Sequence, residues 1–364
     1  LFLGYRAAAN QTTGQAIVAL GHDALYTGTA QNFQTAVGHS AGYSHTGTEG
    51  VLIGSDAGKN SGASHGAVHV GRQAGYYATG NDNVSLGRLA MYSASSSNTG
   101  NSNIAVGRAA LYGLSSGHRN IAIGYAALDA ATTESDNIAI GYDALGGAVA
   151  GGEKNVAIGN YTLDALTSAD NCIAIGHEAG TSITTGFMNA AVGDSSMKLV
   201  STTHKNTSLG AQALMHLTGS SNTSIGAESL KSGYGTNSGS QNTAVGALAG
   251  NLMTSGANNT LLGFQAGNNI TTGHNNVVIG MADVGATSND QLSISSGDGS
   301  PVWITGDSNG NVTLNQLADV VAVAGNTVLT QAQSGSYVYW TSGTLTLPAN
   351  SAAGTHFTIF NDTG

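Results

Sequence analysis

The sequence predicts an all-β protein, a β-solenoid of about 17 short coils followed by a small non-repetitive β region. First, a phrase of the form apolar-small-apolar-Gly-x-x-Ala returns about every seventeen residues over more than three quarters of the chain. Second, large and small side chains alternate before the glycine, and a period of two is typical of a strand. Third, glycine, asparagine and Ser-Gly turns separate the phrases, which fits one narrow β-coil per repeat. A helical solenoid is disfavoured because its repeats run to about 33 to 47 residues.

The repeat divides the chain into three parts. We expect residues 1–285 to form the tandem coils, residues 286–318 a transition β segment, and residues 319–364 the start of a C-terminal β module. A length of 364 residues would otherwise suggest two or three domains, but stacked coils form one continuous body. Because the chain opens inside a phrase and stops abruptly, we expect it to be a piece of a longer protein. The seventeen phrase glycines are Gly4, Gly21, Gly38, Gly54, Gly71, Gly87, Gly107, Gly124, Gly141, Gly159, Gly176, Gly193, Gly210, Gly226, Gly246, Gly263 and Gly280.

Each position of the phrase has an expected role. The residue before the glycine is Ile, Val or Leu in every copy, as at Ile123 and Ile140, and we expect this row to face the core. Alanine stands three residues after the glycine in thirteen copies, which indicates close packing there. The glycine marks a corner where φ is positive or where another backbone comes near. Among the central copies these corner residues are Gly124, Gly141, Gly159 and Gly176.

Asparagine stands four residues before the glycine in eleven of the copies. Stacked coils superpose these side chains, so we expect an amide ladder between successive coils. Asparagine also suits the tight turn that enters the strand. One later copy carries Cys172 in this place, and we expect it to be a small buried hydrophobe. The asparagines are Asn83, Asn103, Asn120, Asn137, Asn155, Asn189, Asn206, Asn222, Asn242, Asn259 and Asn276.

Composition excludes several classes of protein and of site. The net charge is −10 and the ten Lys and Arg residues are scattered singly, so we expect no nucleic-acid partner. No run approaches the roughly 20 apolar residues of a spanning helix, so we expect no membrane insertion. A single cysteine supports neither a disulfide framework nor a zinc pair, and we expect no cofactor.

The apolar content of one coil bears on assembly. Each coil offers only about two or three sizeable apolar side chains, which is little against an ordering entropy of about 1 to 2 kcal/mol per residue. Side-by-side association of identical chains would supply the missing contact area. We therefore expect an obligate homo-oligomer in which the alanine and glycine rows are buried between chains.

Two neighbouring copies carry a family resemblance. Asn-Ile-Ala-Ile-Gly-Tyr-Ala-Ala-Leu at 120–128 and Asn-Ile-Ala-Ile-Gly-Tyr-Asp-Ala-Leu at 137–145 resemble the head repeats of YadA-like trimeric autotransporter adhesins. The same phrase recurs in phage tail fibres. The resemblance covers roughly residues 1–285 and implies a left-handed β-roll, three of which pack around one axis as a homotrimeric rod. The coil of about seventeen residues is longer than the adhesin unit, which leaves the cross-section open.

The C-terminal part indicates which of the two protein classes, phage tail fibres or trimeric adhesins, the chain resembles more. Residues 289–314 read as short strands joined by Gly-Asp-Gly and Asn-Gly turns, and look like the transition that follows such repeats in tail fibres. The last segment similarly resembles C-terminal β-modules of phage fibres, and it holds no heptads of the kind an adhesin stalk would show. The resemblance favours an extracellular virion fibre whose partners are a host cell-surface glycan or protein receptor and other tail proteins. The alternative is an adhesin head on a bacterial cell surface.

Two exposed rows are candidates for glycan binding. Arginine follows the glycine at Arg72, Arg88 and Arg108, and tyrosine stands five residues after the same glycines. Aromatic faces beside guanidinium groups suit an acidic polysaccharide. The alternative, which we favour, is a stacking ladder that stiffens the rod. The tyrosines are Tyr76, Tyr92 and Tyr112.

Metal and catalytic sites are not expected. His22, His39 and His177 share the position after the glycine, where a trimer axis could gather three copies of one ring, but we expect no metal. A glycan-cleaving tailspike is the enzymatic alternative and needs two carboxylates about 5 to 9.5 Å apart. The acidic residues that share one repeat position never fall in consecutive coils, so we expect neither catalytic residues nor enzymatic activity. They are Asp23, Asp56, Asp143, Glu178 and Glu228.

Overall fold

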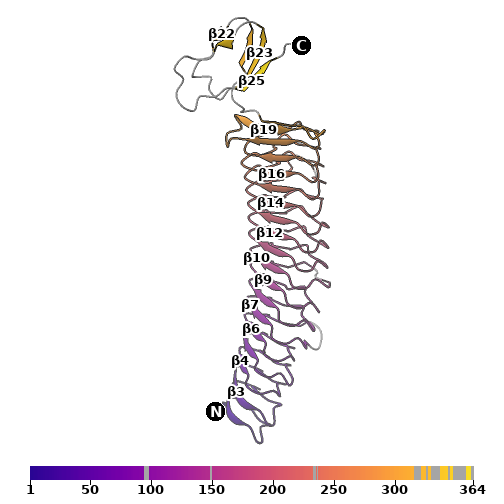
Figure 1. The fold of residues 1–364 in the computed structure, drawn as a ribbon. Coiled ribbons are helices and arrows are strands. Elements are labelled where there is room, and N and C mark those ends of the chain that lie inside the picture. Colours follow the sequence, from indigo (N-terminus) through magenta and orange to yellow (C-terminus); the bar gives the residue numbers. More distant parts are fainter. Residues whose placement is uncertain are drawn as a thin grey trace.

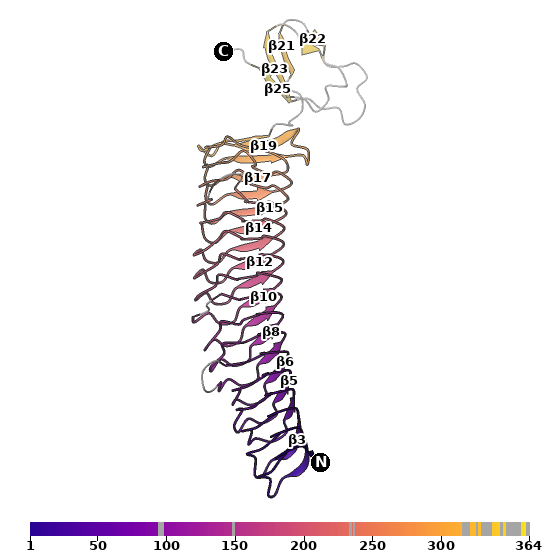
Figure 2. The same cartoon turned by 180° about the vertical axis from the view of Figure 1, so that it is seen from behind.

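The described part of the chain is a column of stacked coils. A computed structural model describes residues 1–314 apart from 94–97, 148–149, 233–234 and 236, and beyond them the backbone of five strands between residues 321 and 361. Figures 1 and 2 show the coils following one another in chain order, with the strands gathered along one side. The described elements are all strands, so the expected all-β solenoid of about 17 coils is confirmed. Three extra residues precede each of Gly107 and Gly246, where the sequence predicts surface loops near 93–97 and 233–239; residues 94–97, 233–234 and 236 of these loops lie outside the described part.

One strand per coil builds a single sheet. Each strand pairs in parallel with the strand of the next coil, and equal phrase positions meet, as where Ile138 lies between Ile121 and Val156. The strands are β1 (Phe2–Leu3), β2 (Gln15–Leu20), β3 (Asn32–Val37), β4 (Val51–Ile53), β5 (Val68–Val70), β6 (Val84–Leu86), β7 (Ile104–Val106), β8 (Ile121–Ile123), β9 (Ile138–Ile140), β10 (Val156–Ile158), β11 (Ile173–Ile175), β12 (Ala190–Val192), β13 (Thr207–Leu209), β14 (Thr223–Ile225), β15 (Thr243–Val245), β16 (Thr260–Leu262) and β17 (Val277–Ile279).

The sheet changes direction at its C-terminal end. β18 (Leu292–Ser295) still pairs in parallel with β17, so the coil register continues beyond residue 285. β19 (Val302–Gly306) and β20 (Val312–Leu314) then add in antiparallel fashion. The backbone farther on forms two small parallel sheets, one of β21 (Val321–Ala324), β23 (Tyr337–Ser342) and β25 (Thr358–Asn361), the other of β22 (Thr327–Val328) and β24 (Leu345–Thr346).

The core lies on the opposite side of the strand from the one the sequence suggested. The middle residue of each central strand, such as Ala122 or Ala139, is fully buried, whereas Ile123 is 38% exposed and Ile140 is half-buried. The expectation that the row before the glycine faces the core is therefore wrong. A strand of three residues points its middle side chain to one face and its two outer side chains to the other. The middle side chain, which is small in most coils, therefore faces the interior, and the two larger outer side chains face outwards.

The interior is completed by the turn after the strand. Three and four residues after the glycine, Ala127 and Leu128 are fully buried, and the same holds for Ala144 and Leu145 one coil on. The Leu128 backbone has a φ of 52°, a left-handed conformation that turns this large side chain inward. The alanine row therefore packs inside each chain, and the expectation that it lies between chains is wrong.

The corner glycines are required for two reasons. At Gly141 φ is +142°, which residues with a side chain rarely adopt. A Cβ atom there would also collide with the carbonyl oxygen of Gly159, the corner of the next coil. The same two conditions hold at Gly124, Gly159 and Gly176, whose φ angles run from +130° to +140°. Stacked corners of this kind allow no side chain.

Candidate functional site

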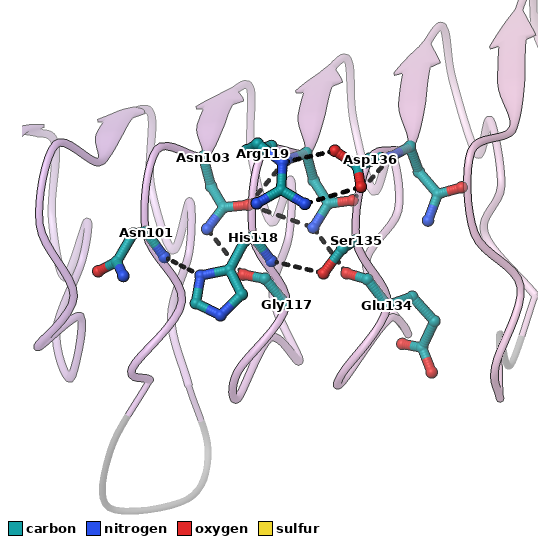
Figure 3. Close-up of polar contacts among 10 residues, drawn as sticks. Asn101, Asn103, Gly117, His118, Arg119, Glu134, Ser135 and Asp136 are labelled. Atoms are coloured by element: carbon teal, nitrogen blue, oxygen red, sulfur yellow. Dashed lines mark hydrogen bonds and ion pairs between the residues drawn. The ribbon is translucent and has the colours of Figure 1, made fainter.

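An amide ladder runs through the interior between coils. The side-chain oxygen of Asn103 accepts hydrogen bonds from the backbone N–H of Asn120 at 2.8 Å and from its side-chain amide at 3.2 Å. Asn103 in turn donates to the carbonyl oxygen of Gly117 at 2.9 Å, which fastens the turn that leads into the next strand (Figure 3). Asn137 and Asn155 continue the ladder in the same way. The asparagines thus satisfy buried donors and acceptors that would otherwise be costly.

Cys172 interrupts this ladder. Its backbone N–H still donates to Asn155 Oδ1 at 2.9 Å, and its thiol lies 3.2 Å from the carbonyl oxygen of Gly186. A thiol offers no amide oxygen, so the Asn189 backbone N–H lacks the asparagine acceptor that the other rungs provide. Burial raises the pKa of the Cys172 thiol, and the side chain is fully enclosed.

A second ladder runs beside the first, six residues before the glycine, and the sequence reasoning missed it. His118 Nδ1 accepts the backbone N–H of Asn101 at 3.0 Å, and the Ser135 hydroxyl oxygen accepts the backbone N–H of His118 at 3.0 Å (Figure 3). Its bonds run in the opposite direction from those of the asparagine ladder. The row mixes His, Asn, Ser and Asp with other residues, so no single residue type marks it. In most coils the side chain carries a hydrogen-bond acceptor, whereas Phe187 and Ala257 of the same row only donate their backbone N–H groups.

Arginine and tyrosine occupy separate rows. The Tyr92 ring lies 5.5 Å from the Tyr76 ring and 5.3 Å from the Tyr112 ring, centroid to centroid. Its two sides therefore meet neighbouring tyrosines and offer no open aromatic platform for a sugar. Among the described residues, the only cation–π contact of the three candidate arginines joins Arg108 to Tyr125 of the next coil, at 5.3 Å. The structure brings the three tyrosines together, and it places the arginines in an exposed row of their own.

The outer face of the sheet carries an aliphatic row one residue before each corner glycine. A second outer row, three residues before the glycine, is aliphatic over most of the column but holds threonine at Thr35 in β3 and in β13 to β16, from Thr207 to Thr260. Monomeric proteins rarely expose a continuous apolar patch of this extent. We call this surface the aliphatic face. On β20 it continues as Val312 and Leu314, which are 61% and 49% exposed. Members that are 36 to 49% exposed are Ile53, Leu86, Ile104, Ile123, Ile173, Ile175, Leu209, Ile225, Leu262 and Val277.

Most of the candidate carboxylates are neutralised within the chain. The Arg6 guanidinium hydrogen-bonds Asp23 at 2.6 Å and lowers its pKa. Lys59, Lys198 and Lys231 pair in the same way, with Asp56, Glu178 and Glu228 respectively. Four of the five candidates thus face a cation.

Asp143 is the exception and lies near two carboxylates that the sequence reasoning did not single out. Burial, together with the nearby charges of Asp143 and Asp164, raises the pKa of Asp129 to about 6. These residues lie on three successive coils. In the part of the chain that the structure describes, no three His, Cys, Asp or Glu side chains are grouped so as to hold a metal ion.

The histidines singled out in the sequence make other contacts. The His22 and His39 rings stack at 5.3 Å, and His177 Nδ1 lies 3.3 Å from an Asp194 oxygen. Two further histidines are enclosed by the coils. His45 and His69 hydrogen-bond through Nδ1 to Ser61 and Ser85, and burial lowers their pKa values to about 4 and about 3. His69 holds the strand-middle place where most coils have alanine.

Neither a membrane-spanning helix nor a similar known protein was found for the described chain. Across its described residues, no helix is long and apolar enough to cross a membrane. No protein-family model, curated protein or solved structure matches the sequence or the fold.

Proposed function

We propose that the chain is the shaft of a phage tail fibre, a stiff homotrimeric rod on the outside of the virion that carries host attachment. The observation that carries the proposal is the aliphatic face, which follows the strands over the whole column. A rod with one continuous apolar side is suited to bundling lengthwise with copies of itself. The repeat phrase adds the resemblance to tail fibres and trimeric adhesins.

Energetics support assembly through this face. Completing the burial of one partly exposed aliphatic side chain contributes on the order of 0.5 to 1 kcal/mol. Summed over the coils, the gain is comparable to the whole stability of an ordinary domain. Because equal positions repeat along the column, parallel chains around a common axis bring equal rows together at every coil. The choice of three chains, and of a left-handed winding, rests on the resemblance.

The same features make the rod a spacer. Two ladders of hydrogen bonds and the stacked corner glycines fix each coil to the next, so a load along the axis meets many parallel bonds. Its expected partners are other tail proteins at one end and a host cell-surface glycan or protein receptor. A bacterial adhesin head is the alternative, and a heptad stalk following the chain in the complete reading frame would favour it.

Immunogold electron microscopy tests the assignment. Antibodies raised against the purified chain should decorate the tails of the virions that carry it and should block their adsorption to host cells. Decoration of a bacterial surface in place of virions would contradict the proposal and support the adhesin. Incubation with host capsule should release no reducing ends, and release would instead identify a glycan-cleaving tailspike.

A further inference from the structure

Three arginines form a cationic strip along the rod. Arg72, Arg88 and Arg108 each follow a corner glycine on three consecutive coils and are exposed. The strands before them, β5, β6 and β7, pair in register, with Val70 opposite Leu86 and Leu86 opposite Val106. The arginines therefore repeat at one strand spacing, about 4.8 Å per coil. We call them the arginine row.

The arginine row has no counter-charge in its own chain. Among the described residues, none of the three takes part in an ion pair, whereas Arg6, Lys59, Arg119, Lys198 and Lys231 all do. The residue that follows each arginine is neutral, namely Gln73, Leu89 and Ala109. In five other coils that place holds an acidic residue, such as the Asp23 that pairs with Arg6.

Unbalanced cations in this register have an energetic consequence. Like charges one strand spacing apart destabilise a sheet, so the arginine row weakens the free protein. The whole chain has a net charge of −10, so the arginine row is a strip of positive potential on a negatively charged protein. An anion that bridges the three guanidinium groups would remove the repulsion and gain charge-assisted hydrogen bonds.

From this geometry we infer that the arginine row binds a linear acidic polysaccharide that runs along the rod axis. A polymer with many carboxylates along its length can face all three guanidinium groups at once, whereas a single small anion cannot span the two strand spacings from Arg72 to Arg108. The Tyr92 ring takes no part through its faces, because neighbouring rings lie on both sides of it. Recognition is therefore by charge. The inference deepens the proposed attachment role, on which its biological meaning rests.

The test uses fluorescence anisotropy with labelled oligogalacturonate and the full chain. The wild type should bind, and the triple variant Arg72→Gln, Arg88→Gln and Arg108→Gln should lose at least tenfold in affinity. A matched variant, Lys198→Gln, Lys205→Gln and Lys231→Gln, changes the net charge equally and should bind within twofold of wild type. Loss of three charge contacts should also reduce the slope of log affinity against log salt by about 2, taking roughly 0.7 per contact for a single-stranded polyanion.

Several outcomes would overturn the inference. These are no binding by the wild type, equal binding by the arginine variant, or equally tight binding of a neutral maltooligosaccharide or of single-stranded DNA. Sedimentation of the same samples separates this site from assembly. If the arginine variant alone dissociates, the arginines pair with a neighbouring chain and the inference is wrong. A trimeric wild type that ignores oligogalacturonate refutes only the inference, and a monomeric wild type that binds it refutes only the proposed assembly.

Discussion

The side-chain oxygen of Asn103 accepts two hydrogen bonds from Asn120 of the next coil, one from its backbone N–H and one from its amide group. Through these bonds each asparagine holds the asparagine of the next coil in place. Since every coil carries the same few contacts, the stability of the rod is approximately a sum over coils and their interfaces. Single substitutions should therefore weaken one place in the column.

Asn103→Ala tests the amide ladder. The change removes four hydrogen bonds and leaves the buried Asn120 N–H and Gly117 carbonyl without partners, so it should cost about 2 to 4 kcal/mol. Hydrogen exchange should show faster opening at Asn120. The control is Asn101→Ala, which removes one exposed bond, to Asn81, and should cost about 1 kcal/mol or less. Equal costs for the two variants would contradict a structural role for the ladder.

Cys172→Asn should stabilise the rod. The new side chain would offer an oxygen to the Asn189 N–H and an amide to the Gly186 carbonyl, which now faces the thiol. Completing the ladder should raise the unfolding free energy by about 1 kcal/mol, measured by urea denaturation. Cys172→Ser should not raise the unfolding free energy, because the serine side chain is too short to bond both the Asn189 N–H and the Gly186 carbonyl. Destabilisation by asparagine would show that this rung does not follow the pattern.

Acid should weaken the N-terminal coils through His45 and His69. Burial lowers both pKa values, to about 4 and about 3, so below pH 6.5 the unfolded chain binds more protons than the folded one. Their stabilising contribution is complete above about pH 6.5 and is lost as the pH falls towards those values. His69→Leu, the residue that Leu52 supplies in the preceding coil, should reduce the pH slope of the unfolding free energy by about 1.4 kcal/mol per unit. An unchanged slope between pH 6 and pH 4 would contradict the assignment.

Gly141→Ala should be among the most damaging single changes. The alanine combines a positive φ with a collision against the Gly159 carbonyl oxygen, and we expect a loss of more than about 3 kcal/mol, seen as a lower melting temperature. Gly297→Ala is the control because nothing lies within 4 Å of the added atom. A melting temperature unchanged in both variants would show that the corners tolerate side chains.

The sequence predicts the coils better than it predicts their orientation. Recurrence of one phrase establishes the parallel register, the corner at Gly141 and the asparagine rungs, because those features repeat by residue type. Alternation with a period of two shows that neighbouring side chains face opposite sides of the sheet, but it does not show which side is buried. The larger side chain, Ile123, is therefore expected inside, whereas Ala122 is the buried residue. The His118 ladder escaped notice since no single residue type marks its row. Ring contacts at Tyr92 depend on side-chain directions that spacing does not give.

The central claim is that the aliphatic face joins three chains. Sedimentation equilibrium of the purified protein tests it most directly, with the double variant Ile123→Glu and Ile140→Glu beside the wild type. The account predicts a wild-type mass of three times the 36.2 kDa of one chain, and dissociation of the variant, because charges on this face cannot be buried. A wild type that sediments as a single chain at all concentrations, or a variant that remains trimeric, would contradict the account.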